Sequence, residues 1–117
     1  MALALEDLQE DVTPERVAEL HAAGKIDLID VRESYEREAG RIAATRHVQF
    51  AQLSDQAETV DRERPVVFYC RSGGRSAVAT QAFRASGYDA HNMTGGLLAW
   101  VEQGLPIEPE DGSVAEH

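Results

Sequence analysis

Reactive residue types are concentrated in one short segment of this sequence, Cys70–Arg75, which reads CRSGGR. It holds the only cysteine of the chain, two glycines and two arginines, and it follows directly on the apolar run PVVFY that begins at Pro65. A cysteine thiolate is a strong nucleophile, and the backbone amides of a glycine-containing loop can turn toward an anion. This combination predicts a reactive cysteine whose negative charge is stabilised by its own loop.

We interpret Cys70 as a catalytic nucleophile and the residues after it as the site for an anionic substrate. Isolated cysteines are often inert core residues, but an inert one requires neither glycines nor arginines beside it. A helix starting near Arg75 would direct the positive end of its dipole to the sulfur, and this favours thiolate over thiol. The residues predicted to bind substrate are Arg71, Ser72, Gly73, Gly74 and Arg75. Ser76 is predicted to cap this helix or to hydrogen-bond the sulfur.

The elements that position this loop follow from the alternation of strand and helix patterns along the chain. Short apolar runs predict strands over 26–31, 46–50, 65–69 and 90–93. Helical spacing and end signals predict helices over 14–23, 35–39, 51–60, 75–86 and 97–103, with Thr13 and Ser34 as caps of the first two. This alternation predicts an α/β fold with a mostly parallel sheet covered by helices on both faces. Ligand sites in such sheets lie at the carboxyl ends of strands, where Cys70 falls.

Composition narrows the class of protein. The 117 residues suit one compact domain, predicted over 1–107, and the polar, acidic segment 108–117 is predicted to be disordered. The formal net charge of −10 argues against binding to nucleic acids and to anionic membranes. A single cysteine cannot form an internal disulfide, residues 1–15 lack the basic start of a signal peptide, and no apolar run has the length of a membrane span. A cytoplasmic location is therefore expected.

Metal and cofactor chemistry have no sequence signal. The four histidines lie at no metal-ligand spacing from one another or from Cys70. The glycine pairs at 73–74 and 95–96 fit neither the dinucleotide fingerprint nor the P-loop. Neither a metal nor a cofactor is predicted.

Three blocks of the sequence resemble, in the same order, the signatures of the rhodanese family. CRSGGRS after VVFY resembles the family's active-site loop, and IDLIDVRESYEREAGRI resembles its strand ending in Asp-Val-Arg, acidic turn and Gly-X-Ile. MTGGLLAWVEQGLPI resembles its closing Gly-Gly, Trp and Gly-X-Pro pattern. The resemblance covers residues 12–107. It implies a single rhodanese-like domain with a central sheet of about five short strands.

The resemblance also implies an enzyme of the thiosulfate sulfurtransferase type that works through a persulfide and requires no cofactor. Cys70 would take a sulfane sulfur from a small anionic donor such as thiosulfate, and a thiol, cyanide or protein acceptor would then remove it. Amides from Arg71 to Arg75 would hold the charge of the persulfide. Asp30 and Arg32 match the Asp-Val-Arg signature and are expected to support the site.

Two alternatives and one departure from the family pattern accompany this hypothesis. The chain could instead serve as a persulfide relay or an interaction module for a dedicated protein partner. A cysteine-dependent phosphatase or arsenate reductase is disfavoured, because such loops place one more residue between cysteine and arginine than the four found here. The family often has proline and glycine where this chain has Ala43 and Ala44, so the shape of that loop cannot be carried over from the family.

Overall fold

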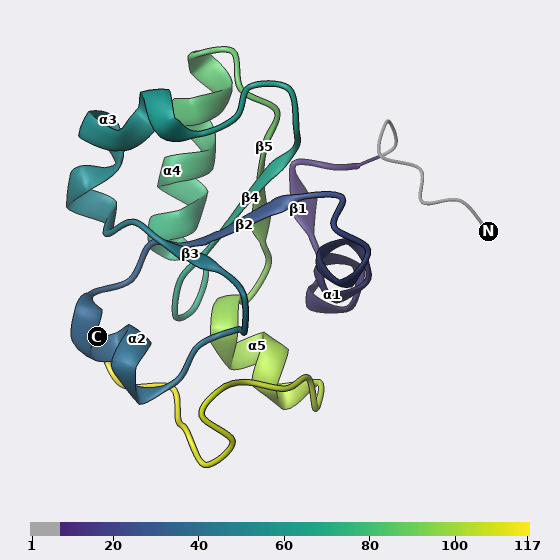
Figure 1. The fold of residues 1–117 in the computed structure, drawn as a ribbon, viewed down its shortest axis with the longest axis vertical. Helices are drawn as coiled ribbons and strands as arrows, with labels where there is room; N and C mark the ends of the chain where they lie inside the picture. The colour runs from purple at the N-terminus through teal and green to yellow at the C-terminus, as the bar shows by residue number, and fades with distance from the viewer. Residues whose placement is uncertain (1–7) are drawn as a thin grey trace.

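The computed structural model describes residues 8–117 as one parallel sheet with helices on both of its faces (Figure 1). The prediction about a signal peptide concerns residues 1–15, of which 1–7 lie outside the described part. Within residues 8–117 the longest helix has 12 residues, so none has the length and apolar character needed to cross a bilayer.

The sheet has five parallel strands in the order β1-β5-β4-β2-β3, which confirms the predicted α/β fold. Their bounds are β1 Asp11–Val12, β2 Asp27–Asp30, β3 Arg46–His47, β4 Val66–Tyr69 and β5 Ala90–Met93. The central strand β4 pairs with β2 and β5, with Tyr69 opposite Asp30 and Phe68 opposite Asn92. β1 was not located from the sequence, because two residues are too few to show a strand pattern.

Helices fill the connections between the strands, and one further helix follows the last strand. They are α1 Pro14–Ala22, α2 Ser34–Ala39, the short series η2 Phe50–Gln52, α3 Leu53–Gln56 and η3 Ala57–Thr59, then α4 Gly74–Ala85 and α5 Gly96–Glu102. Thr13 caps α1 as predicted, because its hydroxyl accepts from the amide of Arg16 at 3.3 Å. Ser34 does not cap α2. It is the first helical residue, and the N-cap is Glu33, whose amide donates to the carboxylate of Glu36.

The central strand β4 is buried on both faces, which explains its continuous apolar sequence. Val66, Phe68 and Cys70 belong to the cluster of apolar side chains under α3 and α4. Val67 and Tyr69 belong to the cluster under α1 and α5. Figure 1 shows these two helix pairs on opposite sides of the sheet. The side chain of Cys70 therefore leaves the strand end on the α4 side.

Residues 108–117 differ from the prediction, because they pack against the domain. The backbones of Arg41 and Glu108 form two hydrogen bonds, of 2.9 and 2.8 Å, and the amide of Ser113 donates to Ala39 O at 2.8 Å. The segment thereby runs beside α2, where Figure 1 places the end of the chain. The structure thus corrects the disorder predicted from composition, since composition does not report backbone pairing between distant residues.

Candidate active site

Cys70 lies at the carboxyl end of β4, where the sequence predicted the reactive loop. Its side chain is 1% exposed and belongs to an apolar cluster that includes Phe68 and Ala79. The amide of Gly73 donates to Sγ at 3.1 Å, and Ser76 Oγ lies 3.4 Å from Sγ. Such polar groups act strongly on the sulfur, because little water is present to screen their partial charges.

Two carbonyl groups of the loop, those of Cys70 and Arg71, accept hydrogen bonds from α5, and this orients the next two amides toward the side on which the sulfur lies. Leu97 N donates to Cys70 O at 2.8 Å, and Leu98 N donates to Arg71 O at 3.0 Å. In a trans peptide the following N–H points opposite to the carbonyl, so the amides of Arg71 and Ser72 point away from α5. That is the side of the sheet on which the Cys70 side chain lies.

Two glycines make this close arrangement possible. Gly73 has a φ of +108°, a left-handed conformation that side chains disfavour, and it is the N-cap of α4. A Cβ on Gly96 would lie 2.5 Å from Cys70 O and 2.6 Å from Arg71 O. Any larger residue at position 96 would separate α5 from the loop. The first turn of α4 then directs its partial positive charge toward the sulfur.

The two loop arginines have different surroundings. Arg75 donates to both carboxylate oxygens of the buried Glu36, at 2.8 and 3.0 Å. The hydrogen bond to Glu36 raises the pKa of Arg75, although burial acts to lower it. Burial acts to raise the pKa of Glu36, but hydrogen bonds from Arg75 and from the amide of Glu33 bring it below its ordinary value. The pair is therefore ionised at neutral pH, and the charge of Arg75 is compensated.

Arg71 keeps an unused donor. Within residues 8–117 its Nε is buried and has no hydrogen-bond partner. A buried donor of this kind is costly unless a ligand or water satisfies it. Within the described residues, Arg71 is therefore the loop arginine that retains a buried donor without a partner.

The remaining predicted loop residues divide into an exposed tip and a buried base. Ser72 and Gly74 are exposed, whereas Ser76 is fully buried. Of the two roles predicted for Ser76, the structure has it beside the sulfur and not as the helix cap, which is Gly73. The Ser76 hydroxyl donates to Asn92 Oδ1 at 2.6 Å.

Asp30 and Arg32 form a buried ion pair at the end of β2. Arg32 Nη2 donates to Asp30 Oδ2 at 2.8 Å and to Gly40 O at 2.7 Å, and Arg32 Nη1 donates to Glu36 O at 3.2 Å. The guanidinium thus joins β2 to the backbone of α2. Since α2 also carries Glu36, which accepts from Arg75, the pair is linked through α2 to the cysteine loop, and its supporting role stays a prediction.

The loop in which this chain departs from the family pattern still makes a turn. Ala44 has a φ of +61°, a left-handed conformation that costs a residue with a Cβ roughly 1–2 kcal/mol. Hydrogen bonds hold it there: Thr45 Oγ1 donates to Ile42 O at 2.7 Å, and Ile42 N donates to the hydroxyl of Tyr69 at 3.2 Å. These hydrogen bonds, one of them to Tyr69 of β4, therefore stabilise at Ala44 a backbone conformation that a glycine would adopt without strain.

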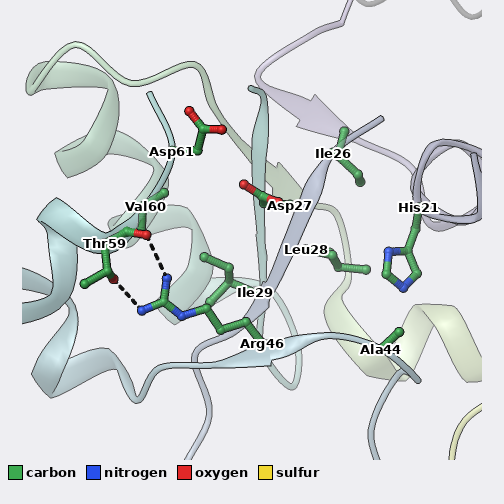
Figure 2. Close-up of a pocket in the computed structure, with 10 residues that line it drawn as sticks. All are labelled: His21, Ile26, Asp27, Leu28, Ile29, Ala44, Arg46, Thr59, Val60 and Asp61. Carbon is green, nitrogen blue, oxygen red and sulfur yellow. Dashed lines mark hydrogen bonds between the residues drawn. The ribbon is translucent and has the colours of Figure 1, made fainter. Parts of the chain in front are cut away.

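A separate pocket, shown in Figure 2, lies at the opposite end of the sheet. Its volume is about 280 Å³, and its lining includes Asp27 at the start of β2 and Arg46 at the start of β3. The Arg46 guanidinium donates to the carbonyl of Thr59 at 3.2 Å and to its hydroxyl. Cys70 follows the carboxyl end of β4, so this pocket is distinct from the cysteine loop.

Two residues of the site were not singled out from the sequence. Glu36 was visible only as part of an acidic turn, and Asn92 only as a polar residue in a predicted strand. A polar residue inside an otherwise buried strand requires a hydrogen-bond partner, and this signal could have identified Asn92. The spacing of Glu33 and Glu36 resembles a capping box, a signal that could have fixed the start of α2.

The protein is a small α/β domain with a cysteine loop at the end of the central strand of a parallel sheet. The chain belongs to the rhodanese-like domain family, whose model matches residues 13–103. The Bacillus subtilis protein YtwF is 31% identical over 100 residues, which are 86% of this chain and 97% of YtwF. A protein of Allochromatium vinosum named sulfurtransferase is 34% identical over 86 residues, covering 73% of this chain and 80% of its own length.

The solved structures agree on the fold. A rhodanese-related protein from Thermoplasma volcanium superimposes with a TM-score of 0.79 over 85% of this chain and 97% of its own. Its sequence is 24% identical, so this likeness concerns the architecture alone.

Proposed function

We propose that this protein is a sulfurtransferase that carries a sulfane sulfur on Cys70 as a persulfide, from a thiosulfate-like anionic donor to a thiol or cyanide acceptor. The observation that carries the proposal is the position of Sγ at the end of β4, where it accepts the Gly73 amide at 3.1 Å beside the first turn of α4. Membership of the rhodanese-like family and the likeness to a protein named sulfurtransferase support it.

The chemistry takes place in two half-reactions at one sulfur. The Cys70 thiolate attacks the outer sulfur of thiosulfate, so that a new S–S bond forms, the S–S bond of the donor breaks, and sulfite leaves with the electron pair. The acceptor then attacks the outer sulfur of the persulfide, and the Cys70 thiolate is released. The Gly73 amide and the positive end of α4 stabilise negative charge on sulfur in both half-reactions.

An anionic donor has to approach a protein whose formal net charge is −10. Local positive charge must therefore attract it. Arg75 is already paired with Glu36, whereas the buried Nε of Arg71 has no partner within the described residues. Arg71 is the group we expect to bind the oxygen atoms of the donor, while its sulfur meets Cys70.

Incubation with thiosulfate is expected to add the mass of one sulfur atom to the protein, and cyanide is expected to remove it as thiocyanate. Because the chain has one cysteine, the adduct reports on Cys70 alone. Intact-protein mass spectrometry without reducing agent measures both steps. An adduct formed only from other sulfane donors would exclude thiosulfate, and no adduct from any of them would contradict the persulfide.

Replacement of Arg71 by alanine is expected to raise the KM for thiosulfate about ten- to a hundredfold, the size expected for one lost hydrogen bond to a charged group. Discharge of a preformed persulfide to cyanide should change much less. Steady-state kinetics measures the first quantity and single-turnover discharge the second.

Arg46→Ala is the matched control for Arg71→Ala, because it removes the same charge at the opposite end of the sheet (Figure 2). Its KM should stay near the wild-type value. Equal increases of KM in both variants would assign the effect to net charge and count against a contact between Arg71 and the donor.

A further inference from the structure

The hydroxyl of Ser76 lies between Cys70 and Asn92, and its single proton can serve only one of them. Ser76 Oγ lies 3.4 Å from Cys70 Sγ and donates to Asn92 Oδ1 at 2.6 Å. Ser76 is fully buried and Asn92 is 6% exposed, so water does not readily replace either partner. The direction of this one O–H bond therefore decides what the sulfur faces.

The side chain of Asp11 in β1 accounts for the direction of the Ser76 O–H bond, because it orients the amide of Asn92. Asn92 Nδ2 lies 3.4 Å from a carboxylate oxygen of Asp11, which can only accept a hydrogen bond. The amide of Asn92 thus has its nitrogen toward Asp11 and its oxygen toward Ser76. The Ser76 proton points to that oxygen, and a lone pair of Ser76 Oγ faces the sulfur.

With its lone pair toward the sulfur, the Ser76 hydroxyl interacts favourably with a Cys70 thiol and unfavourably with a Cys70 thiolate. A thiol can donate its S–H to Ser76 Oγ. A thiolate instead meets a lone pair, unless the Ser76 hydroxyl rotates and leaves the buried Asn92 Oδ1 without a donor, which is unfavourable. We propose that Asn92 is a positioning residue that holds Ser76 as a hydrogen-bond acceptor toward Cys70, so that the Ser76 hydroxyl favours the thiol over the thiolate.

This inference deepens the proposed function, since it concerns the nucleophile of the same site. The Gly73 amide, donating to Sγ at 3.1 Å, acts in the opposite sense and favours the thiolate. Ser76 and Asn92 therefore oppose the effect of the Gly73 amide on the sulfur. The charged groups on the elements packed around Cys70 are Arg71 in its loop, Arg75 of α4 with Glu36 of α2, the Asp30–Arg32 pair, and Asp11 beyond Asn92.

The pH dependence of Cys70 alkylation tests the proposal without any sulfur transfer. Iodoacetamide reacts with the thiolate, and the chain has one cysteine, so the pH midpoint of the alkylation rate reports on Cys70. Ser76→Ala removes the acceptor and is expected to lower the midpoint by about one pH unit, a tenfold change in the thiolate fraction. A higher midpoint in Ser76→Ala would mean that Ser76 donates to the thiolate, and would overturn the proposal.

Asn92→Leu tests the positioning role directly. It frees the Ser76 hydroxyl to donate to the sulfur, so the midpoint should fall at least as far as in Ser76→Ala. The same substitution in the Ser76→Ala background should have no further effect, because Asn92 acts through Ser76. An equal shift in both backgrounds would overturn the role of Asn92. The sign of the Ser76→Ala shift decides between donor and acceptor even where Asn92→Leu does not fold.

Thr80→Val is the matched control on the same helix. The buried Thr80 hydroxyl donates to the backbone carbonyl of Ser76 at 2.8 Å and so contacts the backbone of Ser76 rather than its hydroxyl. Its removal should leave the alkylation midpoint at the wild-type value. A shift as large as that of Ser76→Ala would show that general loosening of α4, and not the orientation of one hydroxyl, controls the thiol.

Discussion

Replacement of Cys70 by serine is expected to abolish sulfur transfer while leaving the domain folded. A serine hydroxyl stays protonated near neutral pH and forms no persulfide, so activity should fall below about one thousandth of wild type. The serine oxygen can still accept the Gly73 amide that Sγ accepts at 3.1 Å. The free energy of unfolding should therefore change by only about 1 kcal/mol. Thiocyanate formation from thiosulfate and cyanide measures the first effect, and urea unfolding measures the second.

The mass assay provides an independent check on Cys70→Ser. The variant should gain no sulfur from thiosulfate, while its circular dichroism spectrum matches that of the wild type. A folded variant that still transfers sulfur would show that another group accepts it. Loss of both activity and fold would instead point to a structural role for the buried thiol, and would leave the mass gain in the wild type as the evidence for the persulfide.

The parts of the site that depend on neighbouring residues could be predicted from the sequence. β4, the cysteine loop and α4 are consecutive, so an apolar run followed by glycines and arginines placed Cys70 at a strand end and a helix start. The Thr13–Pro14 pair likewise identified the start of α1, because capping is decided within one turn. Ser34 misled the prediction for α2 because serine is a preferred N-cap residue, whereas the cap here is Glu33, a less usual residue type at that position.

The parts that depend on distant residues could not be predicted. Glu36 and Arg75 are 39 positions apart, and an acidic residue in a helical turn looks the same whether it is exposed or paired in the interior. Asn92 lies 16 positions after Ser76, on a different strand. Only the order of the strands brings these residues together. The sequence therefore predicted two equivalent loop arginines, whereas the fold compensates Arg75 and leaves the donor of Arg71 unused.

Replacement of Arg32 by methionine is expected to be the most destabilising of these substitutions. Burial acts to lower the pKa of Arg32, but the hydrogen bond and charge of Asp30 raise it, so the guanidinium stays charged. Both side chains of the pair are fully buried, with Arg32 Nη2 2.8 Å from Asp30 Oδ2. Within the described residues, methionine would leave the buried carboxylate with Arg37, at 3.2 Å, as its one charged partner, beside the backbone amide of residue 32, which donates to Asp30 Oδ1 at 3.0 Å. We expect a loss of about 3 kcal/mol in the free energy of unfolding, measured in urea.

Two further variants separate this effect from the loss of an arginine as such. Arg41→Met breaks the ion pair between Arg41 and Glu108, whose side chains are 31% and 49% exposed, and should cost no more than about 1 kcal/mol. Asp30→Leu combined with Arg32→Met removes both buried charges and should recover part of the stability lost in Arg32→Met alone. If the double variant were less stable than Arg32→Met by the full cost of a second deletion, the uncompensated charge of Asp30 would not be the cause. The hydrogen bonds from Arg32 to the carbonyls of α2 would then carry the stabilisation.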